Sequence, residues 1–475
     1  MQMLIGGAWT PAAQGEVIGV FNPATGELLD QVPLGRAEDV DAAAGAAAGA
    51  GPRWSAVPPR ERGKRLYAAA QAIRERKEAL ALLLTREQGK PLAEARNEIL
   101  GAANVLEYYA SIAGTLAGTA AALPGYGHAA VVPQPLGVCA AIVPWNMPAL
   151  ILAWKLGPAL LAGNTMVVKP SRSTPLVSLH IAGIVGDACG VPGAVNMVTG
   201  TGSGAGEALV AHPVVRHVSF TGQTDTGRRV AARASGDLKQ VSLELGGSDP
   251  MIVCGDADIA AAVAGALHGR FYNCGQTCTA VKRLYVEAPV YDEFLRKLAA
   301  GARAIRVGNG IEPGVAMGPL HRAADRDRLC AMVAALQEDG LARVVAGGGI
   351  PGGASPAGQF MEPTILAEPD PAAPVLTEEI FGPVLPVVRV EDLDEAIASA
   401  NRSRYGLGAS IWTRDLAAAA RAAEQVRCGI FWVNQHLKIP PDVPFGGTGA
   451  SGIGRENGMS APQRYMETKT VLVRP

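Results

Sequence analysis

Residues 138–169 read VCAAIVPWNMPALILAWKLGPALLAGNTMVVK and indicate an α/β protein. A β-rich run at 138–143 is followed by an apolar segment of helical length and by a second β-rich run at 165–168. Strand, helix and strand in this order predict a βαβ unit with parallel strands. Polar and helix-breaking residues interrupt the stretch at Pro144, Asn146, Pro148, Lys155, Pro158 and Asn164. A membrane span needs about 20 uninterrupted apolar residues, so we expect buried core here.

The alternation of strand and helix continues toward the C-terminus. Further candidate strands lie at 194–198, 215–220 and 240–243, with helical segments at 175–189 and 203–211 between them. A second series of candidate strands begins beyond residue 247, at 251–253, 283–286, 343–345, 384–390, 410–412 and 429–433. A chain of 475 residues exceeds the usual size of one hydrophobic core. We therefore expect two α/β domains in sequence.

The first 120 residues are mainly helical in pattern. Apolar residues recur at helical spacing among Arg, Glu and Lys in 59–86 and 91–117, which predicts helices there. Residues 41–50 are almost all Ala and Gly. Ala is the strongest helix former, so we predict a tightly packed helix; a flexible spacer is the alternative.

Composition excludes several classes of function. Hydrophobic residues make up 48% of the chain and charged residues 18%, which is typical of a folded globular protein. The net charge of −1, without a cluster of Lys and Arg, argues against nucleic acid or a membrane as partner. Residues 1–10 lack the features of a signal peptide. Seven scattered cysteines argue against a disulfide framework, so we expect a cytoplasmic protein.

A dinucleotide fingerprint is not obvious in this chain. The glycine-rich stretch 200–206 reads GTGSGAG, which does not have the GxGxxG spacing. We predict that it is a turn into a helix.

A set of separated motifs carries the stronger signal. They are Gly7-Ala8-Trp9, Pro144-Trp145-Asn146, Lys169-Pro170-Ser171, Phe220 with Gly222 and Gly227, Leu243-Glu244-Leu245-Gly246-Gly247, Gly275-Gln276-Thr277-Cys278, Glu379-Ile380-Phe381-Gly382-Pro383, Pro444-Phe445-Gly446-Gly447, Ser451-Gly452 and Gly454-Arg455-Glu456. In these residues and in their order the chain resembles the aldehyde dehydrogenase superfamily over nearly its whole length.

The resemblance implies a division of the chain into three structural parts. Residues 1–119 and 138–245 would form a Rossmann-like cofactor-binding domain, and 246–433 an α/β catalytic domain. A small β arm for oligomerisation would comprise 120–137 and 457–475, which predicts a homodimer or homotetramer. The segment 434–456 would be a substrate loop that returns to the cofactor domain.

Cys278 is the candidate nucleophile. An aldehyde can donate a hydride only after its carbon has become tetrahedral, and a cysteine thiolate supplies that adduct as a thiohemiacetal. Gly275 allows close backbone approach. A small buried hydrophobe is the alternative reading of a cysteine, but the Gly-Gln-x-Cys context favours the nucleophile. Cys274 is assigned to packing, and two cysteines without a clustered His predict no metal site.

Two further residues would complete the reaction. By resemblance, the side-chain amide of Asn146 helps to hold the oxyanion, a contact typically worth about 3 kcal/mol of barrier; an Asx turn is its alternative role. Glu244 fits the general base that activates water against the thioester, and a solvated glutamate at a strand end is the alternative. Lys155 and Glu456 resemble a relay pair for this base, or form an ordinary salt bridge.

The cofactor is expected to be NADP or NAD, with a slight preference for NADP. The resemblance assigns the following residues to it: Pro144, Trp145, Lys169, Ser171, Arg172, Gly222, Gln223, Gly227, Leu245, Gly246, Glu379 and Phe381. NAD-preferring relatives often have Glu where this chain has Arg172. An acid repels a 2′-phosphate and an arginine can pair with it; alternatively, Arg172 turns to solvent.

The substrate is expected to be a small-molecule aldehyde without charge, aliphatic or aromatic. Its wall, by resemblance, comprises Met147, Trp154, Tyr272, Thr277, Leu437, Ile439 and Phe445, which are largely apolar. Two other readings stay open. In a CoA-acylating dehydrogenase, CoA would resolve the thioester, although Glu244 argues against this. A binding protein that has lost turnover would not need the set of Cys278, Glu244 and Asn146.

Overall fold

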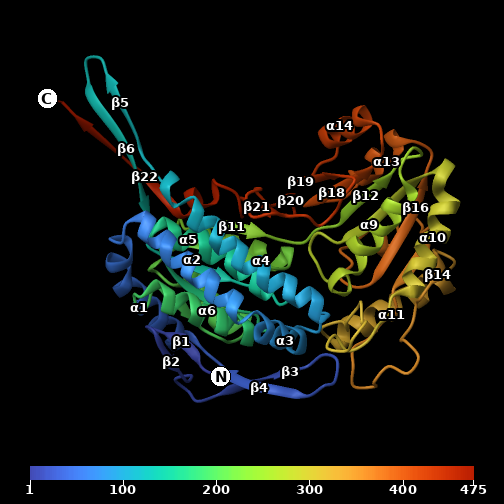
Figure 1. Ribbon diagram of the computed structural model, residues 1–475, viewed down its shortest axis with the longest axis horizontal. Coiled ribbons are helices and arrows are strands. Elements are labelled where there is room, and N and C mark those ends of the chain that lie inside the picture. The colour runs from blue at the N-terminus through green and yellow to red at the C-terminus, as the bar shows by residue number, and fades with distance from the viewer. Residues whose placement is uncertain (475) are drawn as a thin grey trace.

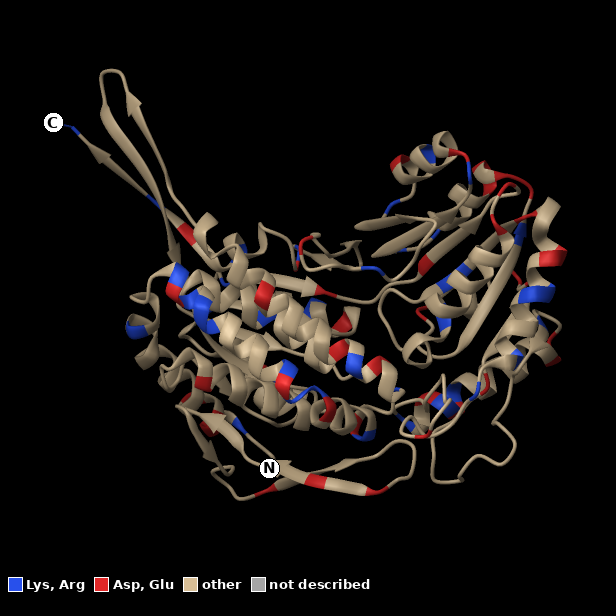
Figure 2. Ribbon diagram, viewed as in Figure 1, with Lys and Arg blue, Asp and Glu red and all other residues tan. Residues whose placement is uncertain are grey.

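The computed structural model describes residues 1–474, which form two lobes and a projecting arm (Figure 1). Each lobe is built around a largely parallel sheet. Lysine, arginine, aspartate and glutamate are interspersed along both lobes (Figure 2), so neither sign of charge dominates one lobe. Within residues 1–474, no helix combines the length and the apolar character that a bilayer crossing requires.

The first sheet has the strand order β2-β1-β9-β8-β7-β10-β11-β21 in the described part of the chain. Its parallel strands are β7 (Val138–Ile142), β8 (Thr165–Lys169), β9 (Val195–Met197), β10 (Val215–Thr221) and β11 (Gln240–Glu244). Antiparallel strands at the edges are β1 (Met3–Ile5), β2 (Ala8–Thr10) and β21 (Gly452–Ile453). The chain reverses its direction of winding between β9 and β10, because β10 pairs with the other side of β7. Ligands bind at the carboxyl ends of strands where such a reversal occurs.

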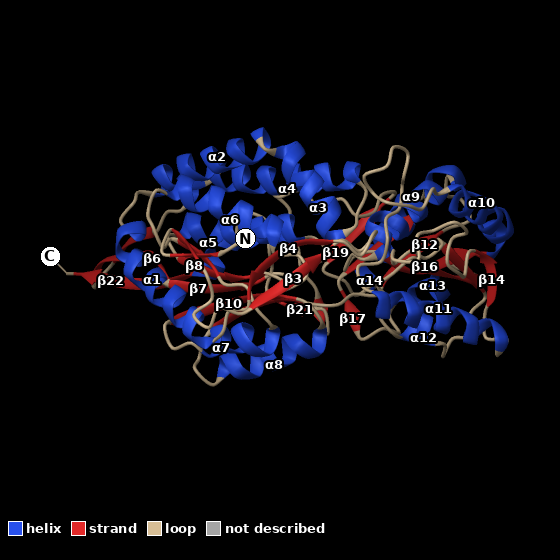
Figure 3. Cartoon of the chain, turned by 90° about the horizontal axis from the view of Figure 1, so that it is seen from below, coloured by secondary structure: helices blue, strands red, loops and turns tan. Residues whose placement is uncertain are grey.

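Helices cover both faces of this sheet (Figure 3). One face packs against α2 (Pro59–Glu75), α3 (Lys77–Gln88), α4 (Leu92–Ser111), α5 (Pro148–Ala162) and α6 (Leu176–Cys189), and the other against α1 (Ala37–Ser55), α7 (Glu207–Ala211) and α8 (Thr224–Ser235). Helix α5 is almost entirely apolar and buried. It begins with Pro148, which suits a first helical turn, and ends at Gly163 in a left-handed conformation with φ 97°.

The second sheet has the order β14-β15-β16-β13-β12-β18-β19 within residues 1–474. Its strands are β12 (Asp249–Val253), β13 (Val281–Glu287), β14 (Arg343–Ala346), β15 (Thr364–Ala367), β16 (Val384–Val390), β18 (Gly408–Trp412) and β19 (Ile430–Val433), of which only β14 is antiparallel to its neighbour. The helices of this lobe are α9 (Ile259–Phe271), α10 (Tyr291–Ala304), α11 (Ala323–Glu338), α12 (Pro374–Thr377), α13 (Leu393–Ala400) and α14 (Leu416–Gln425). Two apolar clusters, one with α9 and α10 and one with α13 and α14, form the core on the two faces.

The arm is a three-stranded antiparallel sheet in the order β22-β6-β5, with β5 (Thr119–Leu123), β6 (Gly127–Pro135) and β22 (Met466–Val473). It projects away from the first lobe (Figure 1), and most of its residues are exposed. Two small antiparallel pairs complete the described residues: β3 (Val17–Phe21) with β4 (Leu28–Pro33), and β17 (Tyr405–Gly406) with β20 (Thr448–Gly449).

The predicted α/β fold class is confirmed, and most predicted elements lie within one or two residues of the observed ones. Residues 41–50 are helical, as part of α1. The predicted helix 59–86 is two helices, since the chain departs from helical geometry at Arg76. The stretch 200–206 is a turn into a helix, in which the Thr201 hydroxyl accepts a hydrogen bond from the Gly204 amide. Strand β15 and the hairpin of β3 and β4 were not anticipated.

Candidate active site

The loops that follow β7, β10 and β11 meet the turn before β13 around one pocket of about 180 Å³. The pocket therefore lies at the carboxyl ends of the central strands of the first sheet, where the strand order reverses. Predicted site residues that line the pocket are Pro144, Trp145, Asn146, Gly222, Gln223, Leu245, Gly246, Cys278, Glu379 and Phe381. The sequence did not point to Thr221, Ile151, Arg322, Asp325 and Arg328, which also line it. The structure therefore brings residues from both lobes together around Cys278.

Cys278 follows a turn with unusual backbone geometry. Asn273 and Cys274 have φ values of 52° and 56°, in the left-handed region that non-glycine residues rarely adopt. Hydrogen bonds hold this turn: the Asn273 amide donates to Glu94 Oε2 (2.9 Å), and the Asn273 side chain donates to the carbonyl of Gln276 (3.2 Å). Strained backbone of this kind persists only where its surroundings fix it, and it is concentrated at functional sites.

Asn146 is attached to the turn that carries the nucleophile. Its side-chain amide is buried and donates to the carbonyl oxygen of Gln276 at 2.9 Å. The carbonyl of Asn146 in turn accepts from Lys90 (2.8 Å) and from the Asn273 side chain (3.0 Å). A side-chain amide has two N–H donors, so one remains for an oxyanion after the bond to Gln276.

A buried ion pair lies next to Asn146, whose carbonyl oxygen accepts a hydrogen bond from its lysine. Lys90 and Glu98 have fully buried side chains and contact each other. Glu98 also accepts hydrogen bonds from the amides of Ala149 (2.9 Å) and Leu150 (3.3 Å), at the beginning of α5. A carboxylate at a helix N-terminus is favourable because the first amides lack partners within the helix. Neither residue was singled out in the sequence, because their role depends on a contact across more than 50 residues.

Glu244 is the last residue of β11 and is 4% exposed. Burial and, second, the nearby Glu456 carboxylate raise the pKa of Glu244 well above its ordinary value of 4.5. Within residues 1–474, its Oε2 has no hydrogen-bond partner. A carboxyl group with a raised pKa is suited to accept a proton near neutral pH.

Lys155 and Glu456 lie together beside this glutamate, as an ion pair of 2.9 Å with both side chains buried. The Ser219 hydroxyl bridges them: it accepts from Lys155 Nζ (2.7 Å) and donates to Glu456 Oε1 (2.8 Å). The charge of Lys155 lowers the pKa of Glu244, whereas Glu456 raises it. The pair can therefore adjust the basicity of Glu244, and its part in a proton relay stays a prediction.

Glu379 contacts the segment between β11 and β12, which connects the two lobes at the pocket. Its Oε1 accepts a hydrogen bond from the Gly247 amide (3.1 Å) and lies 3.5 Å from Lys282 Nζ. A side chain at Gly246 would displace the Glu379 carboxylate, since its Cβ would lie 2.3 Å from Glu379 Oε2. Phe381 packs edge-to-face against Trp145, with 5.6 Å between the ring centroids.

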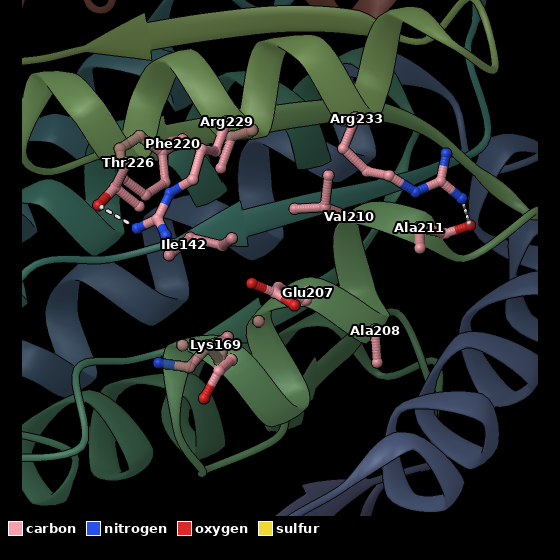
Figure 4. Close-up of a pocket in the computed structure, with 14 residues that line it drawn as sticks. Ile142, Lys169, Glu207, Ala208, Val210, Ala211, Phe220, Thr226, Arg229 and Arg233 are labelled. Carbon is pink, nitrogen blue, oxygen red and sulfur yellow. Dashed lines mark hydrogen bonds between the residues drawn. The ribbon is translucent and has the colours of Figure 1, made fainter.

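A second pocket of about 590 Å³ lies between α7 and α8 on the first lobe (Figure 4). Its walls are largely apolar and include Ile142, Val210, Phe220 and Val230. Lys169, Glu207, Arg229 and Arg233 are its charged residues (Figure 4). Apolar walls suit a purine base and the cations suit phosphate groups. The residues present therefore fit the adenosine half of a dinucleotide.

The basic motif at this pocket divides into a buried and an exposed part. Lys169 is buried and donates to the Pro170 carbonyl (2.9 Å); burial and, second, Arg172 lower the pKa of Lys169 to about 8. Arg172 is exposed, and Ser171 bonds to Ser173 (3.1 Å). The sequence reasoning missed Glu207, Arg229 and Arg233, which come from helices distant in sequence. Glu207 is the most important of these three for the charge of the pocket, because the sequence predicted no acidic residue there.

Only some of the residues predicted for the substrate wall lie together in one apolar cluster. Met147, Trp154, Ile439 and Phe445 belong to the apolar cluster that also packs against Cys278. The rings of Trp154 and Phe445 are 5.1 Å apart. Tyr272 and Leu437 do not belong to this cluster in the described part of the chain, and Thr277 is buried between Gln276 and Cys278.

Comparison with known proteins agrees with this geometry. The chain matches the aldehyde dehydrogenase family over residues 9–471. It is 41% identical to a phenylacetaldehyde dehydrogenase of Pseudomonas fluorescens, covering 99% of this chain and 95% of the relative. It is 42% identical to a succinate-semialdehyde dehydrogenase [NADP(+)] of Escherichia coli, covering 99% and 97%.

Solved structures give the same result. PnpE from Pseudomonas sp. WBC-3 is 40% identical, with a TM-score of 0.97 over 99% of this chain and 97% of that one. The same protein in complex with nicotinamide adenine dinucleotide gives a TM-score of 0.96. The chain therefore belongs to the aldehyde dehydrogenase family, whose members are NAD(P)-dependent oxidoreductases that act on aldehydes.

Proposed function

We propose that this enzyme oxidises an uncharged aliphatic or aromatic aldehyde to its carboxylic acid, with Cys278 as nucleophile, Asn146 as oxyanion donor and Glu244 as general base. The observation that carries the proposal is the convergence of these residues from two lobes. Cys278 packs against an apolar cluster, the Asn146 side chain is bonded to the turn of Cys278, and Glu244 is a buried carboxyl with a raised pKa.

The first half of the reaction forms a thioester on the protein. The Cys278 thiol releases its proton to solvent, and the resulting thiolate adds to the aldehyde carbon to give a thiohemiacetal oxyanion. The free N–H of the Asn146 amide stabilises that negative charge. NAD(P)⁺, when bound, would supply the two-electron acceptor for the hydride that leaves this carbon. The oxyanion electrons then re-form the carbonyl, which leaves the acyl group on sulfur.

The second half releases the acid. Glu244 takes a proton from water while the water oxygen adds to the thioester carbon. The C–S bond then breaks, and the proton held by Glu244 passes to the Cys278 sulfur, which restores the thiol and the free carboxylate. Lys155 lowers the pKa of Glu244 and Glu456 raises it, so this ion pair sets how readily Glu244 takes up the proton. A CoA-acylating enzyme would not need this base, so the position of Glu244 favours hydrolysis.

The substrate wall supports an uncharged aldehyde. Met147, Trp154, Ile439 and Phe445 carry no charge, and Lys438 is exposed. One relative is named for phenylacetaldehyde and another for succinate semialdehyde. An apolar wall favours the former kind, because a buried carboxylate without a partner would be costly.

We further propose that both NAD and NADP are used, with a slight preference for NADP. Lys169, Arg229 and Arg233 outnumber Glu207 in the adenosine pocket, and Arg172 adds a positive charge near Lys169. One relative is named as NADP(+)-dependent and a structural neighbour is in complex with NAD.

A homodimer or homotetramer is proposed from the arm. Its strands leave most residues exposed, including Leu123, Val132 and Leu472. Unpaired strand edges and exposed apolar residues are stabilised when a second subunit covers them. A monodisperse species near 48.9 kDa at micromolar concentration would contradict this.

The free thiols of all seven cysteines agree with a cytoplasmic location.

One assay tests the proposed reaction. NAD(P)H formation is followed with a panel of aliphatic, aromatic and carboxylate-bearing aldehydes, with and without CoA, and the acid is identified by mass spectrometry. We expect free acid as product and the highest kcat/KM for uncharged aldehydes. Acyl-CoA as the main product, or turnover that survives in Cys278→Ala, would contradict the proposal.

A further inference from the structure

Lys282 is a buried lysine that the reaction described above does not use. It is the second residue of β13, and its side chain is fully buried. Its ammonium group donates to the carbonyl oxygens of Thr277 (3.0 Å) and Cys278, and it lies 3.5 Å from the Glu379 carboxylate. An ammonium group has three N–H donors, so one is left beside the Glu379 carboxylate after the two bonds to carbonyl groups.

These contacts fix the turn that carries the nucleophile to the strand that follows it. Cys278 and Lys282 are separated by one short turn, and the lysine closes it by bonding to two successive carbonyl groups. The third contact reaches Glu379, which also accepts from Gly247. Lys282 therefore connects the backbone of the nucleophile with a residue that lines the pocket.

The charges around Cys278 give the lysine a second effect. The groups that act on its thiol are Lys282, Asp249, Glu244 and Glu379 within residues 1–474, so one cation faces three carboxyl groups. Burial is the main reason why the pKa of the Cys278 thiol rises to about 12, and Lys282 is the group that opposes this rise. Without it, a thiolate would be surrounded by carboxyl groups alone.

We propose that Lys282 is a positioning residue for Cys278, which holds its turn against Glu379 and stabilises the thiolate form. The inference rests on the proposed role of Cys278 as nucleophile. The thiolate is the reactive form of cysteine, so the loss of Lys282 slows every reaction that begins at this sulfur, with or without bound cofactor.

The test is the alkylation rate of Cys278 by iodoacetamide in the free enzyme, measured by peptide mass spectrometry as a function of pH. Lys282→Met removes the charge at similar volume. We expect alkylation at pH 7.5 to fall about tenfold or more, and its rise with pH to move at least about one unit higher. The burst of NAD(P)H with aldehyde should slow by a similar factor.

Lys239→Met is the matched control, because Lys239 is also buried and also donates to two carbonyl groups, those of Val210 (2.7 Å) and His212 (2.8 Å). This variant should react at Cys278 within about twofold of the parent, since the charge it loses does not act on the thiol. Lys282→Arg keeps the charge and should alkylate within about threefold of the parent at each pH. It also provides the comparison if Lys282→Met does not fold.

Three results would overturn the inference: unchanged alkylation in Lys282→Met, an equal loss in Lys239→Met, or an arginine variant that reacts as slowly as the methionine variant. If the methionine variant does not fold, an arginine variant that is folded and alkylates more than tenfold slower than the parent overturns it too. None of these readouts requires aldehyde or cofactor. Failure of the proposed reaction would be seen separately, as aldehyde oxidation that survives in Cys278→Ala.

Discussion

Lys155 and Lys282 are both fully buried lysines beside the reaction centre, but they contact different kinds of partner. Lys155, on the first lobe, contacts the side chains of Ser219 and Glu456 next to the base. Lys282, on the second lobe, contacts mainly backbone carbonyl groups of the turn that holds Cys278. Glu244, the proposed base, lies at the end of a regular strand, where neighbouring charges adjust its pKa. Cys278, the proposed nucleophile, follows an irregular turn, which hydrogen bonds hold in position.

The largest effect is expected from Cys278→Ala, which removes the proposed nucleophile on the second lobe. Without a sulfur there is no thiohemiacetal, so both the burst and the steady-state rate should fall by at least about four orders of magnitude. Cofactor binding, followed by fluorescence titration, should be retained. Activity within tenfold of the parent would show that Cys278 is not the nucleophile.

Glu244→Gln removes only the proposed base on the first lobe, so it should separate the two halves of the reaction. Water activation fails, so steady-state kcat should fall by about 10²- to 10⁴-fold. Thioester formation does not require this base, so a burst of NAD(P)H should remain in stopped-flow measurements. An equal loss of burst and steady-state rate would assign Glu244 another role.

Asn146→Ala tests the contact between the lobes at the oxyanion. We expect the burst rate to fall by about 10²- to 10³-fold, because one oxyanion donor is lost. The variant also loses the hydrogen bond to Gln276, so its unfolding transition is measured in parallel. A slower burst with an unchanged transition supports the oxyanion role, and a burst rate close to the parent's contradicts it.

A pair of substitutions sharpens the account of the base by moving its pKa in opposite directions. Glu244 acts when deprotonated, so the hydrolysis rate rises with pH through its pKa. Lys155 lowers that pKa and Glu456 raises it. Lys155→Met should therefore move the rise to higher pH, and Glu456→Gln to lower pH, each by about one unit. Shifts in the same direction would show that the pair acts through packing alone.

The smallest effect is expected at the cofactor pocket. Arg172→Glu should raise KM for NADP by about tenfold, because an exposed Arg–phosphate contact is partly screened. KM for NAD should change little. Equal effects on both cofactors, or a hundredfold preference of the parent for NAD, would show that Arg172 does not read the 2′-phosphate.

Sequence was most informative where the chemistry depends on neighbours along the chain. Cys278 and Glu244 lie in short motifs at the end of a turn and of a strand, and the alternation of strands and helices predicted the two parallel sheets. Lys282 lies only four residues beyond Cys278, yet nothing in its spacing showed that its ammonium group folds back onto that turn. Glu207 and Arg229 line the pocket between α7 and α8 because these two helices pack side by side, which the sequence pattern does not specify.

The arrangement of the first sheet has a consequence for the order in which the enzyme becomes active during synthesis. Strand β21 pairs with β11, and Glu456 pairs with Lys155, so both partners of the N-terminal lobe come from the last segment of the chain. A ribosome-bound chain that has emerged through Cys278 already carries the proposed nucleophile, but Glu244, the proposed base, still lacks the C-terminal edge strand and the Glu456 carboxylate. The surroundings of Glu244 are therefore completed only when the last segment of the chain has been made.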